Sequence, residues 1–331
     1  MLNLGLIGCG HWGKNYVSTM KDIPELNLKY VNDLKAPDIP LSENTIYTKN
    51  LEDVLKDQEV KGVMIVTPTI THYSLAAKAL ENGKHVLVEK PMTSNTKDAE
   101  RLCEIAQANK LNLMVGHVFK YNTAVKTIQE KIFSGEMGKL RYIEARRVGL
   151  GPIRQDVDVL WDFASHDIYI ANMFVGKRPS MVSCIGISHN GNLDDISSLN
   201  LKYENPDVMA TIYVNWEHPV KERKIIVGGS EKAVLFDDVE PADKLKIFDR
   251  GVNYLDTKIG FGTFQAITKQ GDTLIPKLNL SPPLEDEIRH FGECMNGAKC
   301  LSDGYDGLSV VEILEAAEES KKNGGLEVKI K

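Results

Sequence analysis

The feature that most constrains the fold of this chain is the sequence Gly8-Cys9-Gly10-His11-Trp12-Gly13. It is a G-x-G-x-x-G pattern that joins an apolar run, residues 3–8, to a helix-like segment, residues 11–21. The first glycine allows a tight turn, the second lets the backbone approach a pyrophosphate, and the third lets the helix pack on the strand. Free N–H groups at the helix start suit phosphate. The pattern predicts a dinucleotide-binding loop, and a glycine turn without a ligand is the alternative.

Asp33 ends the next predicted strand, 20 residues after Gly13. A carboxylate at that place holds the ribose hydroxyls of the adenosine. It would repel a 2′-phosphate, so Asp33 favours NAD over NADP, whereas Lys35, two residues further on, acts in the opposite direction. We therefore expect NAD as the cofactor, with NADP as the alternative. The competing interpretation of Asp33 is an ordinary residue at a strand end.

Short apolar runs alternate with amphipathic segments through the first 118 residues. Continuous apolar strands are typical of a sheet with both faces covered by helices. Alternation of strands and helices indicates a parallel, doubly wound sheet with right-handed crossovers. We predict strands at residues 3–8, 28–33, 63–66, 85–89 and 112–116 and helices at residues 11–21, 51–56, 71–81 and 96–109.

The pattern changes after Gly116. Between residues 181 and 248, runs of strand character follow one another without helices, which indicates five or six strands in an open, mostly antiparallel sheet. The other predicted elements are helices at residues 122–133, 163–175, 284–296 and 307–322, a strand at 140–148 and a loop at 149–154. We therefore predict an α/β Rossmann domain over residues 1–119 and an α+β domain over residues 120–331, which binds substrate and forms oligomers.

Composition excludes several classes of protein. The net charge of −6 argues against a nucleic-acid partner, because such proteins carry a basic footprint. The N-terminal run lacks the features of a secretion signal, and no run approaches the roughly 18 apolar residues that a membrane helix needs. The 5 cysteines form no C-x-x-C pair, so we expect reduced thiols, no metal site and a cytoplasmic location.

A second motif, Glu89-Lys90-Pro91, ends the predicted strand at residues 85–89. In open α/β sheets ligands collect outside the carboxyl ends of the strands, so Lys90 is expected where the nicotinamide lies. The proline restricts the backbone of Lys90. Thr67-Pro68 ends the preceding strand and His72 opens the helix after it. We predict that these residues and Glu89 share one cofactor-binding rim.

These motifs resemble those of the Gfo/Idh/MocA family, which includes glucose–fructose oxidoreductase and inositol dehydrogenase. The resemblance runs nearly from end to end, and its most specific part is the Glu-Lys-Pro strand end with a later Asp-x-x-x-His segment. It rests on the glycine loop, Thr67-Pro68 with His72, residues 83–91, Val115-Gly116, Asp162 with His166, Asp303-Gly304 and residues 314–317.

By motif position, the resemblance implies that Lys90 contacts cofactor and substrate and that Asp162 and His166 lie beside the reacting hydroxyl. The family often carries an arginine after the last of the predicted Rossmann strands, where this chain has Lys120. Whether Lys120 makes the substrate contact that this arginine makes in the family is therefore an open question. Asn122, shortly beyond it, is predicted as a sugar ligand.

Oxidation of a secondary alcohol requires removal of its proton while hydride leaves. An imidazole such as that of His166 suits this proton transfer, and Asp162, four residues earlier, would orient the ring from the same helical face. Lys90 would stabilise the developing alkoxide, or would itself act as the base if desolvated. The structural alternatives are a helix cap for Asp162, a core histidine for His166 and a surface cation for Lys90.

Weaker signals lie nearby. Arg154, on the loop before the predicted helix at residues 163–175, would bind a phosphate or carboxylate of the substrate, or be a solvated loop residue. Trp216 and His218, at a strand end, are expected to pack in a core or an interface, and lining a pocket is the alternative. The pairs Asp194-Asp195 and Asp237-Asp238 are expected to be solvated turns rather than metal sites.

We therefore predict an NAD(P)-dependent dehydrogenase or ketoreductase that acts on a secondary hydroxyl or ketone of a sugar. The segment from Leu150 to Arg154 with Trp161-Asp162 resembles family members of surface-polysaccharide pathways, which favours a nucleotide-linked sugar. The alternatives are a free polyol or inositol dehydrogenase, a non-catalytic dinucleotide sensor, and an enzyme with tightly held NAD in a closed redox cycle. An open sheet face predicts a homo-oligomer, a dimer or tetramer, through the second domain.

Overall fold

The computed structural model describes residues 1–151, 153–189, 191, 193–254 and 266–330, so Pro152 of the predicted loop lies outside the described residues. The chain divides into two compact units. The first comprises Met1–Asn122 and Ser281–Glu315, and the second comprises Thr123–Leu280 and Ala316–Lys331. No helix in the described ranges is long and apolar enough to cross a membrane.

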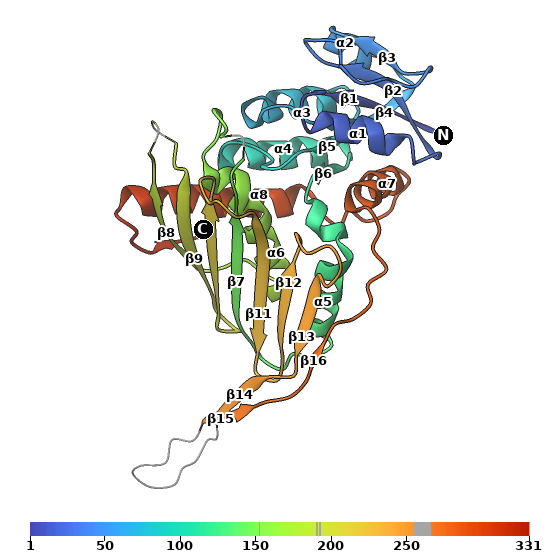
Figure 1. Cartoon of the computed structure of the whole chain (residues 1–331). Helices are drawn as coiled ribbons and strands as arrows, with labels where there is room; N and C mark the ends of the chain where they lie inside the picture. Colours follow the sequence, from blue (N-terminus) through green and yellow to red (C-terminus); the bar gives the residue numbers. More distant parts are fainter. Residues whose placement is uncertain (152, 190, 192, 255–265, 331) are drawn as a thin grey trace. The chain divides into compact units, whose positions relative to one another are not determined.

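A six-stranded parallel sheet forms the centre of the first unit (Figure 1). Its strand order, β3-β2-β1-β4-β5-β6, is that of a doubly wound Rossmann sheet. This confirms the predicted fold class; the short β3 is an addition that the apolar pattern did not indicate. The strands are β1 (Leu2–Ile7), β2 (Leu26–Asn32), β3 (Ile46–Thr48), β4 (Val60–Ile65), β5 (His85–Val88) and β6 (Leu113–Val115).

The helices of the first unit begin where short polar side chains satisfy their free N–H groups. The side chain of Asn50 accepts a hydrogen bond from the Glu52 N–H at the start of α2, and that of Asn95 accepts one from the Asp98 N–H at the start of α4. The helices are α1 (Gly13–Met20), α2 (Leu51–Leu55), α3 (His72–Glu81), α4 (Thr96–Asn109) and α7 (Pro283–Met295), with 3₁₀ turns at Thr69–Thr71 and Val118–Tyr121.

Helix α7 and the first part of α8 (Gly304–Lys322) belong to the first unit. This division differs from the predicted one, which ended the first domain at residue 119. The apolar face of α7 explains the difference, because Ile288 and Phe291 are fully buried in one cluster with Leu4 and Leu28 of the parallel sheet. A helix distant in sequence therefore completes the Rossmann core.

A nine-stranded sheet forms the second unit, in the order β16-β13-β12-β11-β7-β10-β9-β8-β17. Only its pairing of β10 with β7 is parallel among the described strands, so the sheet is mostly antiparallel, as predicted. The strands are β7 (Leu140–Val148), β8 (Met181–Ile187), β9 (Ile196–Tyr203), β10 (Val208–Asn215), β11 (Glu222–Gly229), β12 (Ala233–Asp237), β13 (Leu245–Phe248), β16 (Thr273–Leu274) and β17 (Val328–Lys329). A separate ribbon pairs β14 (Gly251–Tyr254) with β15 (Ala266–Lys269).

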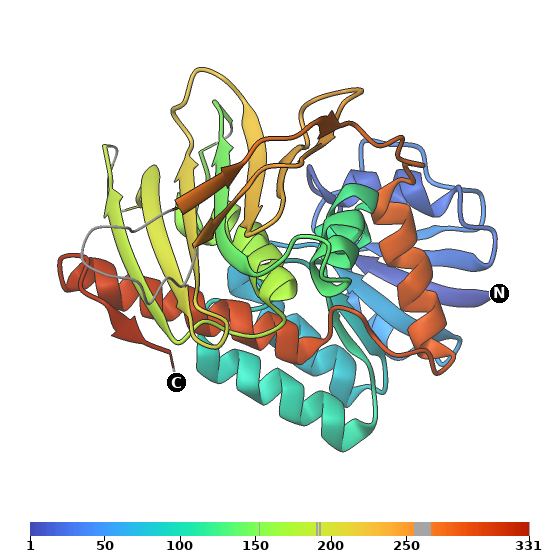
Figure 2. The ribbon, with the colours of Figure 1, turned by 90° about the horizontal axis from the view of Figure 1, so that it is seen from below.

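Helices cover one face of this sheet (Figure 2). Helix α6 (Ser165–Val175) contacts β7 and β10, and α5 (Thr123–Phe133) contacts β12. Strand β10 shows the reason: Val208, Ala210 and Ile212 are buried, while Met209 between them is 54% exposed. Alternation of this kind is what a sheet with one covered face requires.

A buried carboxyl group lies within the first unit. Glu287 of α7 is 0% exposed, and its two carboxyl oxygens have no hydrogen-bond partner among the described residues. Burial, together with the charge of nearby Glu89, holds the pKa of Glu287 well above its usual range. Glu287 is therefore neutral in the folded protein, and its proton is lost only at the cost of placing two like charges in the core.

Replacing Glu287 with glutamine should flatten the pH dependence of stability. The pKa of Glu287 is higher in the folded than in the unfolded chain, so wild-type stability falls as pH rises above about 4.3, by up to about 1.4 kcal/mol per pH unit for one proton. The glutamine variant has no such proton. Its free energy of unfolding in urea, relative to wild type, should rise between about pH 5 and about pH 8. Exposed Glu319 provides the control, Glu319→Gln. A difference that stays constant with pH would contradict a neutral Glu287.

Candidate active site

The glycine loop has the geometry that a dinucleotide requires. Gly8 has a φ of +94°, and a Cβ there would lie 2.4 Å from the carbonyl oxygen of Val66. A Cβ on Gly13 would lie 2.3 Å from the carbonyl oxygen of Gly8, so this glycine allows α1 to approach β1. A Cβ on Gly10 would meet nothing within 4 Å. Only the middle glycine therefore faces open space, and that is where a pyrophosphate would approach the backbone.

Asp33 lies against this loop. Its Oδ2 accepts a hydrogen bond of 2.6 Å from the backbone N–H of Cys9, and its Oδ1 accepts one of 3.0 Å from the N–H of Lys35. The carboxylate is half-buried, whereas the side chain of Lys35 is exposed. The fold thus places an oriented carboxylate directly after β2 and beside the loop, which is the arrangement that holds ribose hydroxyls in dinucleotide-binding domains.

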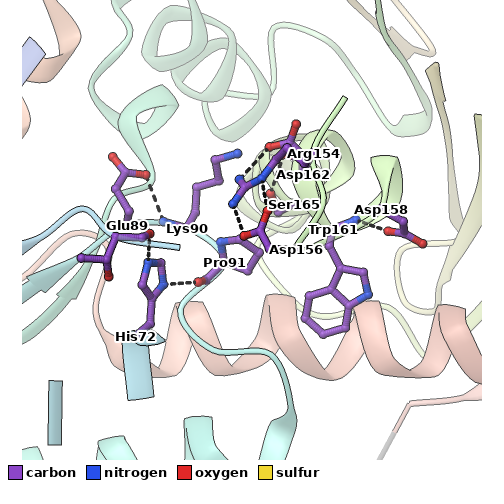
Figure 3. A network of polar contacts seen from close by, with 11 residues as sticks. His72, Glu89, Lys90, Pro91, Arg154, Asp156, Asp158, Trp161, Asp162 and Ser165 are labelled. Carbon is purple, nitrogen blue, oxygen red and sulfur yellow. Dashed lines mark hydrogen bonds and ion pairs between the residues drawn. The ribbon is translucent and has the colours of Figure 1, made fainter. Parts of the chain in front are cut away.

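Glu89 connects the loop to the end of β5. Its carboxylate accepts hydrogen bonds from Trp12 Nε1 at 2.5 Å and from the Tyr16 hydroxyl at 2.8 Å. It also accepts one of 3.0 Å from the N–H of Lys90 (Figure 3). Burial raises the pKa of Glu89, while the Lys90 charge and these donors act in the opposite direction. A Cβ on Gly116 would lie only 3.1 Å from this carboxyl group. Gly116 therefore leaves the room that Glu89 occupies.

His72 holds two strand ends together rather than lining an open surface. It is 1% exposed, and its ring nitrogens lie 2.9 Å from the carbonyl oxygen of Pro91 and 2.8 Å from that of Thr67 (Figure 3). The Thr71 hydroxyl lies within hydrogen-bond distance, 2.7 Å, of both the Thr67 hydroxyl and the carbonyl oxygen of Pro68. These contacts fix the Thr67-Pro68 turn against the segment that carries Lys90. His72 and Glu89 are thus placed to hold the neighbouring segments of the predicted cofactor rim in position.

His117 lies close to Lys90 and was not singled out by the sequence. It is 1% exposed, and burial together with the positive charge of Lys90 lowers its pKa to about 3. The imidazole is therefore neutral at physiological pH, and the site keeps one positive charge rather than two. His117 directly follows the motif Val115-Gly116, and this position in the sequence was the signal that could have identified it as a site residue. Lys120 and the buried Asn122 follow on the 3₁₀ turn Val118–Tyr121 and just after it.

In the second unit, Asp162 lies on a π-helical turn, Leu160–Ala164, that precedes α6. Its carboxylate accepts a hydrogen bond of 3.3 Å from Arg154, which also donates two hydrogen bonds to Asp156 (Figure 3). The regular helix α6 begins at Ser165, three residues after Asp162, with Ala164 at its N-cap position. Asp158 accepts the N–H of Trp161 at 3.0 Å. Arg154, whose side chain is partly exposed, is held beside Asp162 by these ion pairs.

His166 stands in the first turn of α6 and is half-buried. Trp216 is 1% exposed and meets Phe163, on the π-helical turn before α6, edge-on at a ring distance of 6.3 Å. Trp216 is thus a core residue, as predicted. On the following residue, Asp167 forms a buried pair with Arg147 through two hydrogen bonds of 2.9 and 2.8 Å. This pair fixes α6 to β7 and leaves His166 on the less buried side.

The loop before the π turn is anchored by Lys321 at the end of α8. Its ammonium group lies 2.8 Å from Asp158, 2.7 Å from Asp194 and 2.7 Å from Glu318, and its side chain is 12% exposed. Burial raises the pKa of Asp158 to about 6 despite the nearby lysine. The prediction that Asp194-Asp195 form a solvated turn is wrong: Asp194 joins this cluster, and Asp195 is 4% exposed.

Each unit therefore brings together one set of predicted residues. The first unit gathers the glycine loop, Asp33, the Thr67-Pro68 turn, Glu89 and Lys90 through hydrogen bonds or adjacent strand ends. The second gathers Arg154 and Asp162 on one loop and turn, with His166 on the helix that follows. Lys90, Lys120 and Asn122 belong to the first unit.

Comparison with known protein families agrees with this geometry. Residues 2–117 match the Gfo/Idh/MocA oxidoreductase family with an NAD-binding Rossmann fold, and residues 125–235 match the Gfo/Idh/MocA C-terminal domain. Together these matches cover most of the chain. They confirm both the resemblance and the expected NAD-binding domain.

Among characterised relatives, UDP-N-acetylglucosamine 3-dehydrogenase of Acidithiobacillus ferrooxidans is 29% identical over 209 residues, which span 62% of this chain and 65% of that enzyme. The match thus spans slightly less than two thirds of that relative. The scyllo-inositol 2-dehydrogenase (NAD⁺) of Bacillus subtilis is 26% identical over 98% of this chain and 94% of its own.

A solved structure of an oxidoreductase from Magnetospirillum magnetotacticum superposes with a TM-score of 0.79 at 26% identity and covers 95% of this chain and 99% of its own. The fold of both units is therefore shared with that protein. On the family matches and this fold, the chain belongs to the Gfo/Idh/MocA family of NAD-binding oxidoreductases.

Proposed function

We propose that this oxidoreductase transfers a hydride between NAD and a secondary hydroxyl or ketone of a sugar, and that the sugar is linked to a nucleotide. The observation that supports it most is the Glu89-Lys90 strand end, tied through Trp12 to a glycine loop with open space at Gly10. The relative with UDP-N-acetylglucosamine as its named substrate supports the nucleotide-linked class.

The residues suit NAD because the loop offers unobstructed backbone at Gly10 and an oriented carboxylate at Asp33. Gly8, His11, Trp12 and Gly13 complete the proposed cofactor set on the loop. Bound NAD⁺ supplies the acceptor of the hydride. The protein supplies binding, orientation and control of protons and charge.

The proposed proton carrier is His166, with Asp162 as a neighbouring negative charge that stabilises the protonated ring. Lys90 stabilises the alkoxide that develops as the hydroxyl loses its proton. Neutral His117 keeps the ammonium of Lys90 as the positive charge at that strand end. The alternative is the exchanged assignment, with Lys90 as the base and His166 as the electrostatic partner.

Substrate contacts are proposed for Lys120, Asn122 and Arg154. Arg154 is a fixed guanidinium, held by Asp156 and Asp162, and a guanidinium binds phosphate or carboxylate through paired hydrogen bonds. Binding of an anionic, nucleotide-linked substrate would require Arg154 to exchange part of these ion pairs for the substrate. The inositol dehydrogenase relative supports the polyol as the second candidate.

A spectrophotometric screen for NADH formation or consumption across nucleotide sugars, free sugars and inositols tests this proposal. We expect turnover with a nucleotide sugar and a preference for NAD over NADP, because Asp33 repels a 2′-phosphate. Turnover with inositols alone would favour the polyol dehydrogenase. Dinucleotide that copurifies and stays bound through turnover would indicate a closed redox cycle, and binding without turnover of any class would indicate a sensor.

The Gly10→Glu variant should lose dinucleotide binding but keep its fold. Space around Gly10 is open in the protein itself, so the new side chain is accommodated, yet it fills the pyrophosphate position with a negative charge. Calorimetry should give no measurable NADH binding, with an unchanged circular dichroism spectrum. Gly83→Asn, at a glycine that also has open space and whose positive φ asparagine tolerates, provides the control. Wild-type NADH affinity in folded Gly10→Glu would contradict the proposed loop.

Replacing the proposed catalytic groups should lower turnover far more than cofactor affinity. His166→Asn and Lys90→Met should each reduce kcat by roughly 10²–10⁴-fold, the range for a lost acid–base group. Asp162→Asn should cost less, because it leaves the proton carrier in place. NADH affinity should change little in His166→Asn and modestly in Lys90→Met. His218→Asn is the control in the second unit. Near-wild-type kcat in both folded variants would assign His166 and Lys90 to structural roles.

We propose that the uncovered sheet face of the second unit forms a homo-oligomer. Met209 and Tyr142 are paired across β10 and β7 and are 54% and 42% exposed, and Ile185 of β8 on the same sheet is 67% exposed. Apolar side chains gathered on one face favour burial between subunits. Light scattering should give a dimer or tetramer for wild type and a smaller species for Met209→Lys combined with Ile185→Lys. A monomeric wild type would refute this.

For the location we propose the cytoplasm, supported by five free thiols.

A further inference from the structure

Two cysteines outside the proposed active site are in contact. Cys294 lies near the end of α7, and Cys300 follows the helix after a short turn. Each thiol is close enough to the other to be the largest influence on its pKa, and Leu301, next to Cys300, bonds the same imidazole nitrogen as Cys294. Cys294 is 2% exposed, whereas Cys300 is only partly buried. The pair therefore has one sulfur that solvent reaches and one that is protected behind it.

An imidazole adjoins the inner sulfur. His290, one turn earlier on α7, has its Nε2 3.3 Å from the Cys294 sulfur, and the same nitrogen accepts the N–H of Leu301 at 3.3 Å. Its Nδ1 lies 3.2 Å from a carboxylate oxygen of Glu293. This pattern fits the tautomer in which Nδ1–H donates to Glu293 and Nε2 carries the lone pair. A base therefore faces the thiol that must lose a proton if the two sulfurs join.

The five thiols of the chain differ in their readiness to ionise. The neighbouring Cys294 thiol lowers the pKa of Cys300, and the proximity of Cys300 raises the pKa of Cys294. Burial raises the pKa of Cys9, and it raises those of Cys103 and Cys184 to about 12. Because the thiolate is the nucleophile, Cys300 is the cysteine that electrophiles should reach first.

We propose that Cys300 and Cys294 form a peroxide-reactive dithiol, with Cys300 as the attacking thiol, Cys294 as the resolving thiol and His290 as the positioning base. This inference concerns a modification site and does not depend on the proposed substrate. Its elements are those of redox-sensor cysteines: an accessible low-pKa thiol beside a second thiol.

The proposed reaction balances with hydrogen peroxide as the oxidant. The Cys300 sulfur bonds to one peroxide oxygen while the O–O bond breaks, so the sulfur is oxidised to sulfenic acid and the other oxygen leaves as water. The Cys294 sulfur then attacks the Cys300 sulfur, and the S–O bond breaks. The proton of Cys294 passes through His290 Nε2 to the departing hydroxide. Two thiols and one peroxide thus give one disulfide and two waters.

Formation of the disulfide would change the surroundings of the segment from Lys120 to Asn122, which is proposed to bind substrate. The ring of Tyr121 packs against that of His290 at 5.7 Å, and Tyr121 stands between Lys120 and Asn122 in the sequence. A covalent bond that moves the end of α7 would change the surface on which Tyr121 rests. This consequence, unlike the modification itself, rests on the proposed function.

Mass spectrometry of the full chain after one equivalent of hydrogen peroxide tests the proposal. Trypsin cuts after Arg289 and Lys299, so the two cysteines fall on separate peptides, residues 290–299 and 300–321. We expect one disulfide-linked pair of these peptides, reversible by dithiothreitol. With limiting iodoacetamide and no peroxide, Cys300 should be alkylated before the other four cysteines. Preferential reaction of Cys9, Cys103 or Cys184, or no link at full peroxide consumption, would overturn the proposal.

Variants separate the roles. Cys294→Ser should leave a sulfenic acid on Cys300 that dimedone traps, whereas Cys300→Ser should lose both link and adduct. His290→Gln should still form the sulfenic acid but close the disulfide roughly tenfold or more slowly. Cys103→Ser is the matched control and should behave as wild type. A dimedone adduct that appears in Cys300→Ser to the wild-type extent would contradict the assignment of the attacking thiol.

An activity measurement tests the coupling to Tyr121. If an active substrate is found, oxidation should raise its KM in wild type and in Cys103→Ser but not in Cys300→Ser, with NADH affinity unchanged. An unchanged KM in a fully oxidised sample would refute the coupling. The peptide analysis needs no turnover, so failure of the proposed sugar chemistry leaves the dithiol test intact.

Discussion

The carboxylate of Glu89 is the contact on which the cofactor half of the molecule depends. Burying a charge is costly unless it is hydrogen-bonded, and Glu89 receives an indole N–H, a phenol O–H and a backbone N–H from three places on the unit. Those donors lie on the glycine-loop helix and on Lys90. Because a buried carboxylate needs these donors, Glu89 holds two segments together. One is the glycine loop, which would bind pyrophosphate, and the other is the strand end that carries the ammonium group of Lys90.

Burial and nearby charge together explain why two further groups of the first unit are neutral. Burial disfavours the charged form of Glu287 and the charge of Glu89 adds to this effect, so Glu287 keeps its proton while Glu89 is the one with donors. Burial, reinforced by the positive charge of Lys90, likewise keeps His117 neutral. In the second unit Lys321 has an equivalent function, because it binds Asp158 and Asp194 and thereby anchors the turn that carries Asp162. Each half of the proposed site is thus organised around a buried charge.

Local patterns in the sequence predicted what depends on local physics. The strand at residues 140–148 and the helix at residues 96–109 were predicted at the observed bounds, because apolar spacing and the polar residues flanking them act within a few residues. The glycine loop and the Glu-Lys-Pro strand end were found for the same reason. The sequence did not indicate that α7 completes the Rossmann core, because that depends on Phe291 meeting strands more than 200 residues earlier.

The features of the site that were not predicted from the sequence also depend on contacts between residues that no sequence pattern connects. The bond from Arg154 to Asp162, the anchoring of Asp194 by Lys321 and the proximity of His117 to Lys90 join residues whose spacing carries no periodic signal. The π turn at Leu160–Ala164 changes the register between Asp162 and His166, so a regular helical spacing was too simple for this pair.

Transfer of deuterium tests the central claim most directly. A sugar substrate found by the screen is labelled with deuterium at the carbinol carbon and incubated with NAD⁺ and the enzyme. We expect the label on the nicotinamide ring of the product NADH, seen as a gain of one mass unit by mass spectrometry. Unlabelled NADH, or label released to water while the sugar is converted, would contradict direct hydride transfer from a secondary hydroxyl to the cofactor.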